Sequence, residues 1–241
     1  MRNQMNEIET VFRMQIKEYF KDKGTLIFHL CAVVLIGIVA PLFRLNDIVL
    51  LSGSILFPLT LLKQWTAHSF AGEKEMKTIE TILSSPIKSR SLFYGKCMYC
   101  IVSSGVCYLS IFILMLLVKI FTKEYFQINF WEWVGMLILF IHILLTVTLI
   151  GVDRSITSDD IRTANSKLTL VFYPIYIYIV ILFNLFTQHL MVATYLLSAV
   201  FLVVLMGVNS YFIFIKVKKM DRSYFAESYK KVGVSDEITN V

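Results

Sequence analysis

The chain has 241 residues, of which 57% are hydrophobic and 17% are charged, and its formal net charge at pH 7 is +6. Charged residues make up about a quarter of a soluble domain, and a water-soluble fold could not hide this much apolar surface. The composition therefore excludes a soluble globular protein and indicates one integral membrane domain with short connections.

Residues 1–24 have the pattern of an amphipathic helix, with apolar residues on one face and basic residues on the other. The apolar face contains Ile8, Val11, Phe12, Ile16, Tyr19 and Phe20, and the basic face contains Arg13, Lys17 and Lys21. This pattern predicts an interfacial helix that lies on the cytoplasmic leaflet. A plain juxtamembrane extension with the same charges is the alternative.

Residues 25–216 contain six apolar runs, each close to the roughly 20 residues that a helix needs to cross a bilayer. The runs are Thr25–Phe43, Ile48–Thr66, Cys97–Phe121, Trp133–Val152, Leu168–Phe186 and Met191–Ile215. We therefore predict an all-α bundle of six spans within a single transmembrane domain that covers residues 1–241. Residues 217–241 are expected to form a polar cytoplasmic tail.

Basic residues gather on one side of the predicted spans. Alternate connecting segments carry 20 of the 23 Lys and Arg residues, and only Arg44, Lys119 and Lys123 lie on the other side. By the positive-inside rule, both termini lie in the cytoplasm of a multi-pass plasma-membrane protein. A basic rim in contact with lipid headgroups accounts for the positive charge without a nucleic-acid partner.

The connection between the second and third runs, residues 73–96, reads EKEMKTIETILSSPIKSRSLFYGK. Glu73 and Glu75 favour a helix start because their charges complement its positive end, and Pro86 ends the helix by excluding helical geometry before it. Between these limits Met76, Ile79 and Leu83 repeat at helical spacing. A short helix is therefore predicted over about 73–85.

A second helix is predicted to begin with Ser89 as its N-cap and to continue into the third span. The chain would then leave the membrane, form a short helix roughly parallel to it and return. Such a shape suits contact with a cytoplasmic partner. A helix that rests only on lipid is the alternative.

This connection resembles the signature of ABC type-2 exporter permeases, in which an acidic-basic-acidic triplet precedes Gly-Thr, Glu, Leu-Leu, Pro and a final Gly-Lys. The matching residues here are Glu73-Lys74-Glu75, Lys77-Thr78, Glu80, Leu83, Pro86, Arg90 and Gly95-Lys96. The chain departs from the signature at Lys77, where Gly is usual, and at Ile82, where Leu is common. We expect Lys77 to favour the short helix, because Lys has the higher helix propensity.

The resemblance implies that the short helix is a coupling helix, which fits a groove on an ATP-binding subunit. The residues that it assigns to ATPase coupling are Glu73, Glu75, Met76, Thr78, Ile79, Glu80, Leu83 and Pro86. A second, shorter cytoplasmic contact is expected after the fourth span, at Asp159, Asp160 and Arg162. There, Thr157 and Asp160 resemble a capping box.

The family also implies an assembly with two ABC ATPase subunits and a second permease subunit, identical or similar. Because the chain has no GxxxxGK[ST] motif, we expect it not to be an enzyme, and ATP and Mg are expected to bind to the partner. No cofactor, metal site or catalytic residue is expected in the chain. The single CxxC, Cys97 and Cys100, has no second Cys or His pair nearby, so we interpret both as small apolar residues.

Compact size and the lack of a large extracellular domain suggest, within this family, export of an amphipathic peptide, toxin or antibiotic, or immunity against one. Lipid-linked polysaccharide, drug and sodium export are family alternatives. From another class, an ion-coupled secondary transporter would need ionisable groups inside its spans, and His142 is the main candidate here. A membrane scaffold without transport activity is a third hypothesis. The pattern identifies no substrate-binding residues.

Overall fold

The computed structural model describes residues 2–42, 47–123, 130–187, 191–219 and 224, and all regular secondary structure in these ranges is helical. The main helices are α1 (Arg2–Lys21), α2 (Lys23–Val34), α3 (Ala40–Leu42), α4 (Asp47–Glu75), α5 (Ile79–Ser84), α6 (Ser89–Thr122), α7 (Phe130–Ile156), α8 (Ile161–Thr187) and α9 (Met191–Tyr211). A π-helical turn, Leu35–Val39, joins α2 to α3, and a second π-turn, Phe212–Lys216, and a 3₁₀ turn, Val217–Lys219, follow α9. The all-α prediction is confirmed for this part of the chain.

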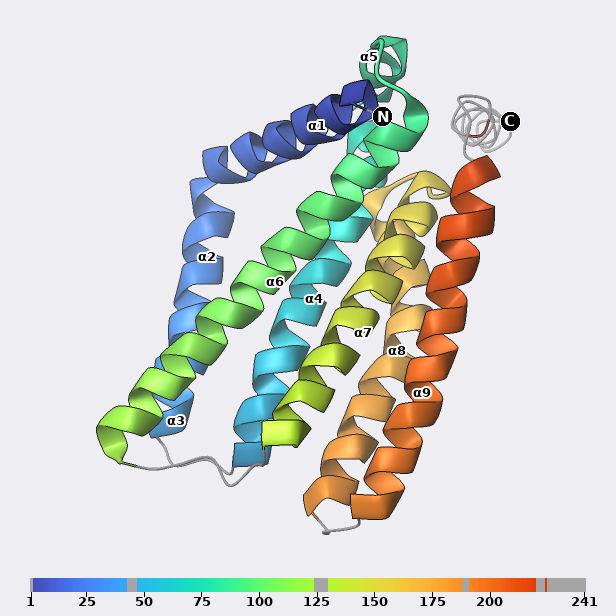
Figure 1. Cartoon of the computed structure of the whole chain (residues 1–241). Coiled ribbons are helices and arrows are strands. Elements are labelled where there is room, and N and C mark those ends of the chain that lie inside the picture. The colour runs from blue at the N-terminus through green and yellow to red at the C-terminus, as the bar shows by residue number, and fades with distance from the viewer. Residues whose placement is uncertain (1, 43–46, 124–129, 188–190, 220–223, 225–241) are drawn as a thin grey trace, which may run out of the picture.

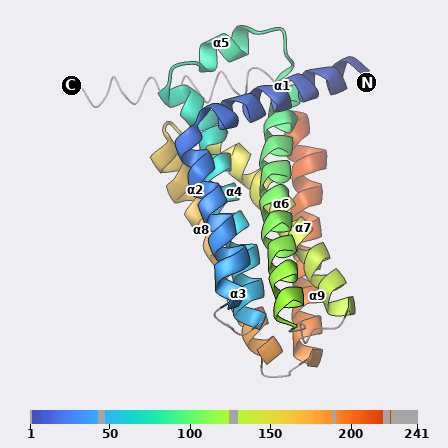
Figure 2. The same ribbon diagram turned by 90° about the vertical axis from the view of Figure 1, so that its left-hand side faces the viewer.

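The long helices run alongside one another in a bundle, and α2 with α3 continues this arrangement beside α6 (Figure 1). Helix α1 lies across one end of the bundle, and α5 lies at the same end, beyond α1 (Figure 2). The α7–α8 turn and the C-terminal end of α9 are also at this end (Figure 1). We refer to it as the α1 end.

Five stretches of helix are long and apolar enough to cross a membrane, judged by length and composition within the described residues. They are Lys23–Leu42, Ser89–Thr122, Val134–Ile156, Ile161–Ile181 and Ala193–Lys216. These stretches coincide with five of the six predicted runs, so the chain is a multi-pass membrane protein. The remaining run, Ile48–Thr66, falls within α4, which packs against α6, α7 and α8. The count of six spans stays a prediction.

The main core lies between α4, α6, α7, α8 and α9. Its fully enclosed members include Leu59, Leu62, Met115 and Ile143. Large apolar side chains are also exposed on the outside of the bundle, among them Leu109, Phe121, Leu170, Leu196 and Val203. Exposed apolar surface on this scale marks a protein whose surroundings are apolar, as the composition predicts.

Helix α1 is held against α6 by close backbone packing. A Cβ atom at Gly95 would lie 2.7 Å from the Val11 side chain, so a residue larger than glycine does not fit there without displacement. The side chain of Val11 is buried at this contact, and the backbone N–H of Lys88 donates to the Glu7 carboxylate at 3.3 Å. The first helix is therefore a packed part of the fold and not a loose extension.

Candidate functional site

The predicted coupling helix is shorter than the sequence suggested, and it begins later. Glu73 and Glu75 do not start it, because α4 continues to Glu75 and carries both residues in its last turn. The short helix is α5, Ile79–Ser84, so the predicted start near residue 73 was wrong, and the helix ends one residue before the predicted limit of 85. The N-cap prediction at Ser89 was also wrong, since Lys88 is the N-cap of α6 and Ser89 is its buried first residue.

A tight C-terminal cap separates α4 from α5. The N–H of Thr78 donates to the Glu73 carbonyl at 2.9 Å, and the N–H of Lys77 donates to the Lys74 carbonyl at 3.0 Å. This pair of bonds is a Schellman motif, whose penultimate residue adopts left-handed geometry and is usually glycine. Lys77 occupies that position with φ of 56°. The expectation that Lys77 favours a helix was therefore wrong, because it lies where a helix ends.

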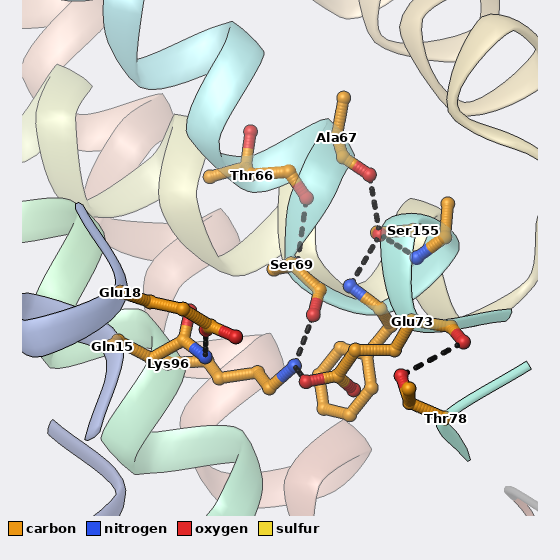
Figure 3. A network of polar contacts seen from close by, with 11 residues as sticks. Gln15, Glu18, Thr66, Ala67, Ser69, Glu73, Thr78, Lys96 and Ser155 are labelled. Carbon is orange, nitrogen blue, oxygen red and sulfur yellow. Dashed lines mark hydrogen bonds and ion pairs between the residues drawn. The ribbon is translucent and has the colours of Figure 1, made fainter. Parts of the chain in front are cut away.

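Glu73 forms a buried ion pair with Lys96 of α6 (Figure 3). The Lys96 side chain is only 1% exposed. Its ammonium also donates to the Ser69 carbonyl and lies 4.1 Å from the centre of the Phe70 ring. Burial raises the pKa of the Glu73 carboxyl, and the neighbouring ammonium opposes that shift. This pair joins the end of α4 to the start of α6.

The other predicted coupling residues divide into one anchor and an exposed set. Ile79 is 2% exposed and packs in a cluster that includes Val11, Phe70, Leu92 and Phe93. The exposed set comprises Glu75, Met76, Thr78 and Pro86, and Met76 is 74% exposed. Glu80 and Leu83 belong to α5, but their side chains lie outside the described residues.

The second predicted contact, at the α7–α8 turn, is built around the N-terminus of α8. Asp160 accepts a hydrogen bond from the Thr163 N–H at 2.5 Å, and the bonds from Thr163 lower the pKa of its carboxyl. Asp160 is thus the cap, and the predicted capping box with Thr157 was wrong. The Thr157 hydroxyl instead contacts the carbonyls of Asp153 and Arg154 in α7.

The structure brings the two predicted contacts side by side. The N–H of Ile161, at the start of α8, donates to the Glu75 carboxylate at 3.4 Å. Glu75, Asp160, Ile161, Arg162 and Asn165 line a shallow hollow between them. Asp159 and Arg162 are both exposed. The sequence separated these elements by more than 80 residues and offered no sign of this contact.

Two residues that the sequence did not assign to the site, Ser155 and Lys74, bind α4 to α7. The Ser155 hydroxyl of α7 accepts from the N–H groups of Phe70 and Ala71, at 3.0 and 2.9 Å, and donates to the Ala67 carbonyl at 2.8 Å (Figure 3). Lys74 donates to the carbonyls of Ile156 and Ser158, the latter at 3.0 Å. Burial lowers the pKa of Lys74 to about 8. A serine and a lysine are too common for their sequence positions to have indicated these contacts.

The described residues contain no group of three or more His, Cys, Asp or Glu side chains that could hold a metal ion. Cys97 and Cys100 are buried free thiols in α6. Nδ1 of His142 lies 2.9 Å from the Ile138 carbonyl of its own helix.

Polar contacts at the α1 end join the C-terminal ends of α4 and α7 to the N-terminal ends of α6 and α8. The contacts of Lys96, Lys74 and Ser155 are buried, and that between Glu75 and Ile161 is exposed. No curated protein and no solved structure matches the chain. A family model described as "ABC-2 family transporter protein" matches residues 3–200, which is most of the sequence. The chain therefore belongs to the ABC-2 transporter family.

Proposed function

We propose that this chain is the permease subunit of an ATP-driven exporter, and that a separate ATPase docks at the α1 end on α5 and the α7–α8 turn. Family membership supports the permease role. The observation that carries the docking site is the position of α5, which lies beyond α1 at the end of the bundle (Figure 2). Met76, in the link between α4 and α5, is 74% exposed.

The proposed orientation follows from charge. The segments at the α1 end are those that carry most of the Lys and Arg residues, and such segments stay in the cytoplasm. With α4 as the remaining span, the chain crosses the membrane six times and keeps both termini on the cytoplasmic side. The ATPase, with its bound ATP and Mg, would then meet α5 from the cytoplasm.

The buried contacts supply a route for force. Ile79 fixes α5 to the bundle, and the Glu73–Lys96 pair joins α4 to α6, so a displacement of α5 acts on two spans. Lys74 and Ser155 extend the same connection to α7. The exposed residues would contact the ATPase, whereas Glu73 and Ile79 would transmit its movement.

We further propose an assembly of two ATPase subunits and two permease subunits, identical or similar, so that each α5 meets one ATPase. The cargo class that fits best is an amphipathic molecule such as a peptide, toxin or antibiotic, and the physiological role is its export or immunity against it. The chain itself supplies no ATP-binding motif.

Docking is tested by expressing the chain with the ATPases encoded beside it and measuring how much ATPase co-purifies from membranes. Met76→Asp places a charge on an exposed apolar side chain at the proposed interface, and we expect a loss of at least about fivefold in captured ATPase. Met5→Asp is the matched control, because Met5 is also a methionine and is 70% exposed, on α1.

Two outcomes would contradict the proposal. One is that no ATPase with a Walker A motif co-purifies with the unaltered chain. The other is that deletion of residues 76–83 leaves membrane insertion and transport unchanged, which would favour a helix that rests only on lipid. Transport that follows an ion gradient and ignores ATP depletion would favour a secondary transporter.

A further inference from the structure

A pocket of about 420 Å³ lies where α1 crosses the end of α4. Side chains of α1, α4, residues 76–81 and α6 line it. Its volume is within the range of small-molecule sites, roughly 300–1,000 Å³. Helices α1 and α4 form most of its wall, and the pocket adjoins the surface proposed for the ATPase, because Met76 and Thr78 line it as well.

One end of the pocket is aromatic. Trp65 lies edge-on to Tyr19, with ring centres 6.1 Å apart, and its ring centre is 6.3 Å from that of Tyr99. The Tyr19 hydroxyl is hydrogen-bonded to Nδ1 of His29 at 2.7 Å, which holds the Tyr19 ring in place. Aromatic faces of this kind attract organic cations and also pack against apolar chains.

The other end is polar and acidic. Gln15, Glu18, Glu73 and Thr78 line it, and Gln15 and Glu18 lie beside the Lys96 side chain (Figure 3). Glu73 is eight residues after Trp65 on α4, a separation of about 12 Å along the helix. From Trp65 to Glu73, the residues of α4 that line the pocket therefore change from aromatic to acidic, in the direction that leads from the bundle towards its α1 end.

The charges at the polar end leave a negative excess. One carboxylate oxygen of Glu73 binds Lys96, whereas Oε2 is buried and has no hydrogen-bond partner among the described residues. The exposed Glu18 carboxylate accepts a hydrogen bond from Gln15 at 3.2 Å. Two carboxylates thus face one ammonium. A cation would be attracted here and a phosphate repelled.

We infer that this pocket binds an amphipathic organic cation, with its cationic head near Glu18 and Glu73 and its apolar part against Trp65, Tyr19 and Tyr99. A zwitterionic phospholipid fits less well, because its phosphate would lie close to the same carboxylates. The identification of this cation as the cargo rests on the proposed function. The binding of the cation to the pocket does not rest on that function, so binding and transport can be tested separately.

Fluorescence of Trp65 provides a direct test. The chain has three tryptophans, so Trp131→Phe and Trp133→Phe leave Trp65 as the only reporter. The full chain is placed in phosphatidylcholine nanodiscs and titrated with an alkyltrimethylammonium that carries a terminal bromine, which quenches tryptophan. The matching brominated alkyl sulfate reports simple partition into the bilayer. We expect saturable quenching by the cation and only non-saturating quenching by the sulfate.

Glu18→Gln removes one charge without disturbing the buried Glu73–Lys96 pair, and we expect it to weaken apparent affinity about fivefold. Glu9→Gln, an exposed glutamate elsewhere on α1, is the matched control and should leave affinity unchanged. Equal quenching by both probes, or unchanged affinity in Glu18→Gln, would overturn the inference. If the cation binds in phosphatidylcholine nanodiscs but not in phosphatidylethanolamine nanodiscs, binding depends on the bilayer lipid. That result would overturn the inference in favour of a lipid site. None of these readouts requires an ATPase.

Discussion

The ion pair between Glu73 and Lys96 makes a strong prediction about stability. Removing one partner of a buried pair costs about 3–5 kcal/mol, because the remaining charge stays buried. In Glu73→Gln the Lys96 ammonium keeps the Ser69 carbonyl and the Phe70 ring. The ring can contribute about 2 kcal/mol in a dry site. We therefore expect Glu73→Gln to lower the free energy of unfolding by about 3 kcal/mol, near the lower limit of that range.

The opposite change, Lys96→Met, should cost less. Burial already raises the pKa of Glu73, so the carboxyl can bind a proton once the ammonium is gone. We therefore expect Lys96→Met to lower the free energy of unfolding by about 2 kcal/mol. The double variant should also lose about 2 kcal/mol, mainly for the buried Gln amide. The two residues are then coupled by about 3 kcal/mol.

A double-mutant cycle measures this coupling. Each variant is unfolded by SDS in mixed micelles, and loss of structure is followed by circular dichroism. The exposed pair Arg13–Glu9, with side chains 72% and 56% exposed, is the control, and its coupling should be no more than about 0.5 kcal/mol. If the effects of Glu73→Gln and Lys96→Met simply add, the pair does not hold α4 and α6 together and the proposed force route loses its main link.

Three further predictions concern the same end of the bundle. Lys77→Gly should stabilise the fold by about 1 kcal/mol in SDS titration, because glycine adopts the left-handed geometry without strain; a loss of stability would contradict the assigned cap. Ser155→Ala should lower the free energy of unfolding by about 1–3 kcal/mol, since three buried backbone groups of α4 lose their hydrogen-bond partner. Ser155→Cys should recover part of this free energy in the same SDS titration. Asp160→Ala should cost about 1 kcal/mol. Because hydrogen bonds lower the pKa of Asp160 below 3.8, its contribution is present above about pH 5 and lost as the pH falls through the folded-state pKa. Asp160→Asn should remove that pH dependence, and an unchanged acid-unfolding profile would refute the role of the cap.

Hydropathy predicted the helical bundle and five of its candidate spans because runs of about 20 apolar residues leave few alternatives in a bilayer. The limits of the coupling helix were wrong for a local reason. Acidic residues stabilise a helix start, yet Glu73 and Glu75 lie at a helix end, where Glu73 is stabilised by Lys96. Tertiary contact overrode the local preference.

The left-handed turn at residue 77 could not be recognised either, because lysine stands where the family signature has glycine. Glycine at residue 77 would have indicated a helix end, whereas lysine suggested continuation. Burial of Lys96 could not be foreseen either, because its ammonium contacts Ser69, Phe70 and Glu73, which lie on another helix. Contacts between segments distant in the chain, such as Glu75 with Ile161, leave no periodic pattern in the sequence.

The hydroxyl of Ser155 has a mechanical consequence. Since it bonds three backbone groups within one turn of α4, that turn cannot bend or twist without breaking contacts to a neighbouring helix. The stiffness of α4 at this level is therefore shared with α7. A force on the end of α4 is resisted by two helices together, so a small displacement at the α1 end can reach the middle of the bundle before it is absorbed as local bending.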